Sequence, residues 1–199
     1  MSKFLKASLF VVFVVIVFCV INCKIVVYGI EQGVGQFNIL HKAVSIEKVL
    51  ASEEYPDSMK IKLRLVQEIR SFAMDSLGLN YSKNYTKVYD QKGDTIIWIL
   101  FAAPEFEMSV HYWKFPFVGE LPYIGFFKKQ KAVKEQNKMI EMGYDVRMGT
   151  VTAWSTLGYF KDPVLSNFLY RKEGELAELI IHELTHTTIF IKGDAQFNE

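Results

Sequence analysis

The feature that most constrains this chain is a short group of ionisable residues inside a long apolar segment near its C-terminal end. Residues 182–186 read His-Glu-Leu-Thr-His, and the segment around them, AELIIHELTHTTIFI, is otherwise rich in apolar residues. Apolar residues at this density predict a helix that is buried on nearly all sides. Burying two imidazoles and a carboxylate without partners costs several kcal/mol, so the segment predicts a bound divalent cation that satisfies all three groups.

The spacing of the two histidines is that of a metal clamp. His182 and His186 lie four residues apart, so a helix places one imidazole a turn above the other on the same face. Both can then bind one ion, and zinc–nitrogen distances in proteins are about 2.0–2.1 Å. Glu183 follows His182 by one residue and so lies about 100° around the helix from it. There it can reach a water molecule on the metal without binding the metal itself. We therefore predict His182 and His186 as metal ligands and Glu183 as general base. His41 and His111 have no partner at this spacing and are interpreted as ordinary loop or surface residues.

A zinc hydrolase needs a third protein ligand, with water in the fourth position. After His186 the chain offers the carboxylates of Asp194 and Glu199. Gly193 suits the C-terminus of the first helix, and Asp194 suits the N-cap of a second helix that begins AQFNE. A second helix that turned back across the first could deliver Glu199 to the metal, whereas Asp194 is interpreted as a cap.

The N-terminal segment has a different character. MSKFLK supplies two lysines, and the run from Ala7 to Cys23 then carries no charge. Such a run is an export signal or a membrane anchor, and the lysines before it place everything after Lys24 outside the cytoplasm. The run ends in VINC, so lipidation of Cys23 and an uncleaved anchor both stay open. Either gives a membrane-tethered protein in the cell envelope, on the periplasmic side.

The rest of the chain predicts helices with a small sheet, which is the α+β class. The formal net charge is only +1, so the composition does not favour nucleic acid as a partner. The predicted elements are a turn at EQGVGQ (31–36), helices over 37–50, 59–77 and 127–142, a hairpin of strands 85–90 and 95–101, an irregular aromatic loop over 111–127, a strand over 144–154 and a helical turn over 163–168. In the helix over 59–77, the basic residues are expected on the side opposite the apolar residues.

Several segments resemble one known family, the predicted zinc aminopeptidases. Its members are bacterial, membrane-associated and often lipoprotein-like proteins. The resemblance implies a zincin-like metallopeptidase domain over residues 29–199, preceded by a signal or anchor segment over residues 1–28. It also implies a gluzincin-like site, with Zn²⁺ held by His182, His186 and Glu199. The segments that carry the resemblance are FAAPEF (101–106), WKFPFVG (113–119), AWSTLGYFKDPVLSNFL (153–169) and HELTHTTIFIKGDAQFNE (182–199).

The expected function is zinc-dependent hydrolysis of peptides, and the aminopeptidase character is implied only by the resemblance. Zinc lowers the pKa of a bound water, Glu183 takes its proton, and the hydroxide attacks a peptide carbonyl. The strand over 144–154 is a candidate for pairing with an extended peptide, although a plain core strand fits it equally. The alternative is a membrane-tethered, non-catalytic zinc-binding protein. The family continues after FNE with a further helical region, so we expect this sequence to be a C-terminally truncated member with weak metal binding and little activity.

Overall fold

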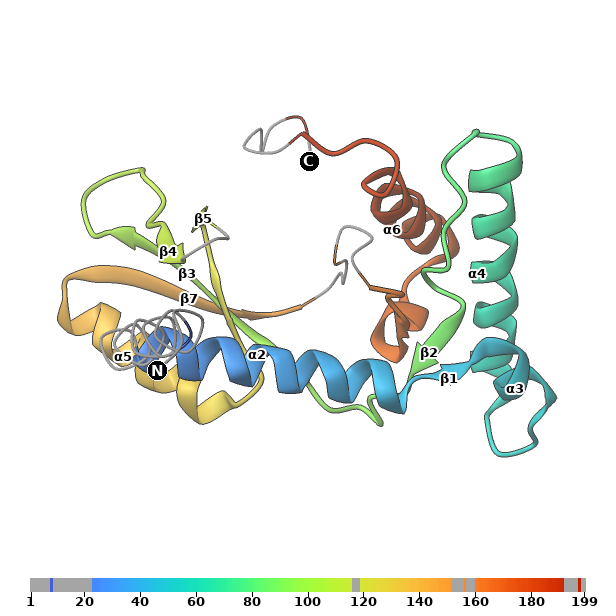
Figure 1. Cartoon of the computed structure of the whole chain (residues 1–199), viewed down its shortest axis with the longest axis horizontal. Coiled ribbons are helices and arrows are strands. Elements are labelled where there is room, and N and C mark those ends of the chain that lie inside the picture. The colour runs from blue at the N-terminus through green and yellow to red at the C-terminus, as the bar shows by residue number, and fades with distance from the viewer. Residues whose placement is uncertain are drawn as a thin grey trace. The chain divides into compact units, whose positions relative to one another are not determined.

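The computed structural model describes residues 8, 23–115, 119–151, 156, 160–191 and 197, which form a mixed α+β fold (Figure 1). The chain divides into two compact units. Unit 1 comprises Met1–Gln36 and Leu100–Arg147, and unit 2 comprises Phe37–Ile99 and Met148–Glu199. Helix α2 (Cys23–Lys42) and two strands contribute residues to both units.

Unit 1 is built on two small sheets. The three-stranded sheet has the order β6-β3-β7, and β7 lies at one end of that order. In the two-stranded sheet, β4 (Trp113–Phe115) pairs antiparallel with β5 (Gly119–Leu121). Helix α5 (Lys129–Glu141) contacts β6 and ends before Gly143, whose φ of +82° suits a glycine that terminates a helix. The three strands of the larger sheet are β6 (Ile124–Phe126), β3 (Trp98–Pro104) and β7 (Tyr144–Thr150).

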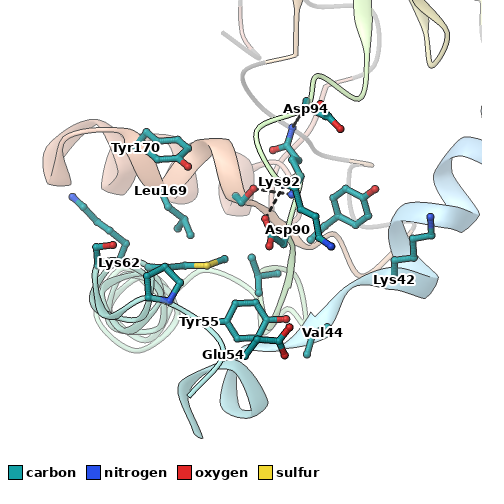
Figure 2. Close-up of a pocket in the computed structure, with 17 residues that line it drawn as sticks. Lys42, Val44, Glu54, Tyr55, Lys62, Asp90, Lys92, Asp94, Leu169 and Tyr170 are labelled. Carbon is teal, nitrogen blue, oxygen red and sulfur yellow. Dashed lines mark hydrogen bonds between the residues drawn. The ribbon is translucent and has the colours of Figure 1, made fainter. Parts of the chain in front are cut away.

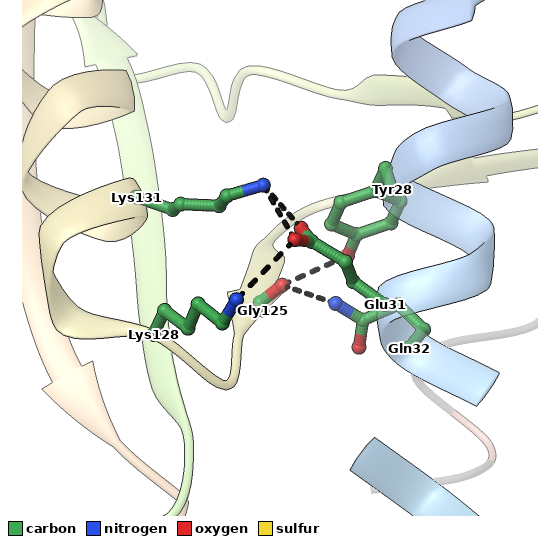
Figure 3. A network of polar contacts seen from close by, with 6 residues as sticks. All are labelled: Tyr28, Glu31, Gln32, Gly125, Lys128 and Lys131. Carbon is green, nitrogen blue, oxygen red and sulfur yellow. Dashed lines mark hydrogen bonds and ion pairs between the residues drawn. The ribbon is translucent and has the colours of Figure 1, made fainter. Parts of the chain in front are cut away.

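Helix α2 is held in unit 1 by one side of its N-terminal part. The Tyr28 hydroxyl and the Gln32 amide both donate hydrogen bonds to the carbonyl oxygen of Gly125, at 2.9 and 3.0 Å (Figure 3). A Cβ atom at Gly35 would overlap the ring of Phe127, so only glycine allows this close approach. The segment EQGVGQ is therefore helical, and the turn predicted there is wrong. Packing against unit 1 outweighs the cost of about 1 kcal/mol that each glycine adds inside a helix.

Unit 2 has a three-stranded sheet of its own, in the order β1-β2-β8. The central strand pairs antiparallel with β1 and parallel with β8, so Val88 lies between Val44 and Val164. Val88 and Val164 are completely buried and form part of the core. Helix α4 contacts α3, α6 and η1. The elements are β1 (Val44–Ser45), α3 (Ile46–Ala51), α4 (Asp57–Asp75), β2 (Lys87–Tyr89), β8 (Val164–Leu165), the 3₁₀ helix η1 (Ser166–Tyr170) and α6 (Glu173–Thr185).

Helix α4 confirms the helix predicted over 59–77, with bounds of Asp57 and Asp75. Most of its apolar side is buried as the spacing predicted, but Phe72, which belongs to the same apolar pattern, is 51% exposed. Arg70 lies among the buried residues with only 7% of its surface exposed. The expectation that all basic residues face away from the apolar side is therefore wrong for Arg70. Three hydrogen bonds, described below, compensate the burial of its guanidinium. The buried apolar residues are Leu63, Val66, Ile69 and Ala73.

Three other predicted segments fold differently. Strands β2 and β3 belong to different sheets, so the predicted hairpin over 85–101 is wrong. The loop between them is fixed to η1 instead: the Gln91 N–H donates to Ser166 Oγ at 2.9 Å, and the Asn167 N–H donates to Gln91 Oε1 at 3.0 Å. The helix predicted over 37–50 is divided between α2 and α3, because β1 intervenes to pair with β2. The helical turn predicted over 163–168 becomes β8 followed by η1.

The aromatic segment over 111–127 was predicted as an irregular loop and contains three short strands, β4, β5 and β6. Pro122 lies between β5 and β6, where its missing N–H costs no strand hydrogen bond. Helix α5 confirms the helix predicted over 127–142. Strand β7 confirms the first part of the strand predicted over 144–154, and residues 152–155 lie outside the described residues.

The predicted N-terminal anchor falls mostly outside the described residues, which begin their continuous run at Cys23. Within the described part of the chain, no helix combines the length and the apolar character that crossing a membrane requires. The anchor therefore stays a prediction.

Candidate metal centre

Helix α6 carries both predicted histidine ligands. Its residues Leu176, Ile180 and Leu184 follow one another at intervals of one turn and are completely buried, and the helix contacts α4. The side chains of His182 and His186 are half-buried. The helix is thus buried on one side and not on nearly all sides, which corrects the prediction from its composition.

The predicted continuation of this helix towards Gly193 is also wrong, because α6 ends at Thr185. The threonines there make local bonds that compete with helix propagation. The hydroxyl of Thr185 donates to the carbonyl of Ile181 at 2.8 Å, and that of Thr187 donates to the carbonyl of Leu184 at 2.7 Å. His186 therefore lies at the C-cap, within the reach of the last helical turn.

The imidazoles of His182 and His186 face each other. Their Nε2 atoms are 3.0 Å apart, and their ring planes are 82° apart. This is hydrogen-bond distance between the two rings. Two nitrogens that bind one tetrahedral zinc ion at 2.0–2.1 Å lie about 3.3 Å from each other, so a small separation of the rings brings the pair to the geometry of a shared ion. Burial lowers the pKa of His186, and the charge of His182 lowers it further. A lowered pKa favours the neutral imidazole, which is the form that binds metals.

Glu183 occupies a different side of α6 from the histidine pair and is only 7% exposed. A second buried ionisable group belongs to the same region, because Tyr85 has no exposed surface and its pKa depends on Glu183. Burial raises the pKa of Tyr85 well above its usual value, and the negative charges of Glu183 and then of Asp162 raise it further. The Tyr85 hydroxyl therefore stays protonated in a region that already contains two acidic groups.

The backbone around Tyr85 is held by two side chains of α4. Tyr85 has a φ of +59°, a left-handed conformation that is rare for residues other than glycine. Its carbonyl oxygen accepts a hydrogen bond from Gln67 Nε2 at 2.9 Å. Arg70 donates to the carbonyls of Asn84 and Ser82 at 2.7 and 2.8 Å, and to Gln67 Oε1 at 3.0 Å. Backbone strain of this kind persists only where the surroundings fix it, and it is common at functional sites.

Asp162 supports the same segment from the other side. Its carbonyl oxygen accepts the Tyr85 N–H at 2.7 Å, and its own N–H donates to Asn84 Oδ1 at 3.2 Å. The carboxylate is almost fully buried and accepts bonds from the Thr156 N–H and hydroxyl at 2.7–2.8 Å. Burial raises the pKa of Asp162, and the bonds from Thr156 oppose that rise.

The sequence reasoning missed Arg70, Tyr85 and Asp162. One signal could have found Arg70: it lies four residues after Val66 and seven after Leu63, so helical periodicity places it on the apolar side of α4. A charge at such a position needs partners, and its partners surround Tyr85. Tyr85 itself gives no comparable signal, because its part in the site depends on contacts between segments that are distant in sequence.

Other predicted site residues do not join this group in the described structure. Glu199 and Asp194 lie outside the described residues, so the predicted third ligand stays a prediction. Within the described part of the chain, no group of three or more histidine, cysteine or acidic residues is placed to hold a metal. His41 stacks on Phe37, and His111 packs edge-on against Trp113 and Tyr144.

A separate cavity of about 960 Å³ lies in unit 2 among β2, η1 and the start of α4 (Figure 2). Neither histidine of α6 lines it. Its charged lining residues are balanced, which gives no preference for a ligand of either sign. They are the lysines Lys42, Lys62 and Lys92 and the acids Glu54, Asp90 and Asp94.

The model of a family described as "Putative aminopeptidase" matches residues 27–199, which is most of the chain. No curated protein and no solved structure matches the sequence.

Proposed function

The chain belongs to the family described as "Putative aminopeptidase", and on that premise we propose that it hydrolyses peptides at a zinc site on α6. The family suggests peptide hydrolysis. The observation that supports the metal is the Nε2–Nε2 distance of 3.0 Å between His182 and His186. Two half-buried imidazoles at this distance offer two lone pairs to one ion without a large rearrangement.

In this proposal His182 and His186 hold the ion and Glu199 supplies the third ligand, in a zincin-like domain. Bound zinc would supply a lowered pKa for a water molecule and a positive charge beside the peptide carbonyl. Glu183 accepts the proton of the attacking water. Its low exposure supports this role, because the side chain is largely shielded from bulk solvent. Removal of single amino acids from the N-terminus of a peptide is the exopeptidase activity that the family description suggests.

We also place the reaction outside the cytoplasm, with the domain tethered through residues 1–28. The support for this part is the uncharged run from Ala7 to Cys23 and the lysines before it. The tether is independent of the hydrolytic site, so the two parts of the proposal can fail separately.

A Glu183→Gln variant tests the catalytic part. Glutamine has nearly the same volume as glutamate but cannot accept the proton. The variant should therefore retain its zinc, while hydrolysis of aminoacyl amide substrates should fall by about two to four orders of magnitude. Elemental analysis measures the zinc, and release of a fluorescent amine measures the hydrolysis. Glu178→Gln is the matched control, because Glu178 is an exposed residue of the same helix.

The competing function is that of a non-catalytic zinc-binding protein. It predicts zinc in both variants and no zinc-dependent hydrolysis in any form of the chain. Wild-type hydrolysis that survives Glu183→Gln would contradict the assignment of Glu183 as the general base.

A further inference from the structure

One face of α2 within unit 1 is apolar and exposed. Val27, Ile30 and Val34 are 50%, 60% and 55% exposed, and the thiol of Cys23 is exposed as well. These four residues follow one another at intervals of four, three and four positions, so they lie on the same side of the helix. An exposed strip of this kind on an ordered helix marks a surface that meets an apolar partner.

The opposite side of α2 fixes the direction of this face. Tyr28 and Gln32 bond to the carbonyl oxygen of Gly125 (Figure 3). Gly35 packs against Phe127. Burial raises the pKa of Tyr28 to about 12, so its hydroxyl stays a hydrogen-bond donor at any physiological pH. The apolar strip is therefore held outward by contacts that belong to unit 1 itself.

Charge is confined to one border of the strip. Between Cys23 and Gln36 the sequence has only two charged residues, Lys24 and Glu31, which are seven positions apart and share one side of the helix. Glu31 lies 2.6 Å from Lys131 Nζ and 3.8 Å from Lys128 Nζ (Figure 3). The border therefore contains three ammonium groups, those of Lys24, Lys128 and Lys131, and one carboxylate, that of Glu31. The side chains of Lys128 and Lys131 are still 67% and 41% exposed. The border has an excess of positive charge.

An apolar strip with a basic border is the pattern of a helix that lies in the interface of a membrane with anionic lipids. The sequence supports the same partner, because the uncharged run from Ala7 leads directly into this helix at Cys23. A second copy of the chain fits less well. Three aliphatic side chains offer far less than the roughly 800 Å² per partner that a standard specific interface buries.

We infer that the N-terminal part of α2 lies on a lipid bilayer, with Val27, Ile30 and Val34 at the acyl boundary and with Lys24, Lys128 and Lys131 against anionic headgroups. This contact orients unit 1 on the membrane, and it does not depend on the proposed hydrolysis. This contact differs from a flexible tether, because a tether alone would leave the apolar strip in water.

Site-specific fluorescence on the full chain tests this orientation. Cys19 and Cys23 are replaced by serine, and a single cysteine is introduced as Ile30→Cys or Val34→Cys and labelled with an environment-sensitive dye. Ile140→Cys is the matched control, because Ile140 is an exposed apolar residue of α5 in the same unit. The proteins are reconstituted into vesicles of phosphatidylcholine with phosphatidylglycerol. Dyes at positions 30 and 34 should shift to shorter wavelength, be quenched by a nitroxide lipid and be several-fold less sensitive to aqueous iodide than the dye at position 140.

The charge requirement is tested with Lys24→Gln combined with Lys128→Gln. This change should weaken the lipid quenching in vesicles that contain phosphatidylglycerol and have little effect in pure phosphatidylcholine. An unchanged signal would overturn the assignment of anionic headgroups. Equal iodide sensitivity at positions 30, 34 and 140 would overturn the whole inference. So would energy transfer between labels on different copies without lipid quenching, because that result assigns the strip to a second copy.

Discussion

Replacing Arg70 by methionine tests whether the polar scaffold around Tyr85 stabilises unit 2. Arg70 has only 7% of its surface exposed, and its guanidinium donates three hydrogen bonds, two of them to the backbone carbonyls of Asn84 and Ser82. Methionine retains much of the apolar stem and removes all three donors. The carbonyl oxygens then lose a charged partner inside the protein.

The magnitude follows from the bonds that are lost. A hydrogen bond to a charged group contributes about 1.5–3 kcal/mol, so three of them contribute roughly 4.5–9 kcal/mol before the cost of burying the charge. The desolvation of the buried guanidinium offsets much of this gain, since burial opposes the charged form and lowers the pKa of Arg70. We expect a net loss of about 3 kcal/mol in the free energy of unfolding.

Urea unfolding followed by far-ultraviolet circular dichroism measures this loss, and hydrogen exchange of the peptide over 80–90 locates it. The control is Arg64→Met, because Arg64 is an exposed residue of the same helix. A surface substitution of this kind changes stability by less than about 0.5 kcal/mol. Equal effects of the two substitutions, or unchanged exchange over 80–90, would show that Arg70 does not stabilise the segment around Tyr85.

Two further predictions concern one residue in each unit. In Tyr85→Phe the dependence of stability on alkaline pH should weaken: the folded state raises the pKa of Tyr85, so its contribution is fully present below the unfolded value of about 10 and is lost as the pH rises above it. Urea midpoints measured at increasing alkaline pH check this, and identical slopes in the two proteins would contradict it. Gly35→Ala should destabilise unit 1 by about 1–3 kcal/mol through overlap with Phe127, whereas Gly33→Ala, which meets nothing within 4 Å, should be neutral or stabilising. Thermal unfolding separates these two variants, and equal melting temperatures would show that Gly35 has no packing role.

The helices were predictable where their periodicity is local. Leu63, Val66, Ile69 and Ala73 recur at helical spacing and define α4 without any knowledge of its neighbours. The strands were less predictable, because their pairing is distant in the sequence. Val88 pairs with Val44 and Val164, and no local pattern distinguishes that arrangement from a hairpin with the next strand. The turn predicted at the glycines of α2 was wrong for a similar reason. Only the contact of Gly35 with Phe127 explains a helix there.

In the candidate site, too, the local relations could be predicted from the sequence and the long-range ones could not. The relation between His182 and His186 is a property of one helix, so their spacing in the sequence was enough to predict facing imidazoles. The relation of Glu183 to Tyr85 depends instead on another segment of unit 2, and Asp162 acts on Tyr85 from a third segment. The position of Glu199 depends on tertiary structure in the same way, and the helical spacing around His186 does not determine it.

Cobalt binding tests whether the two imidazoles of α6 hold one divalent ion. The full chain is freed of metal and titrated with Co²⁺, whose visible absorption reports a tetrahedral site, and zinc is then added as a competitor. We expect saturation at one ion per chain, displacement by zinc, and loss of the spectrum in His182→Ala and in His186→Ala. An unchanged spectrum in both variants, or no tetrahedral absorption in the wild-type chain, would contradict this expectation.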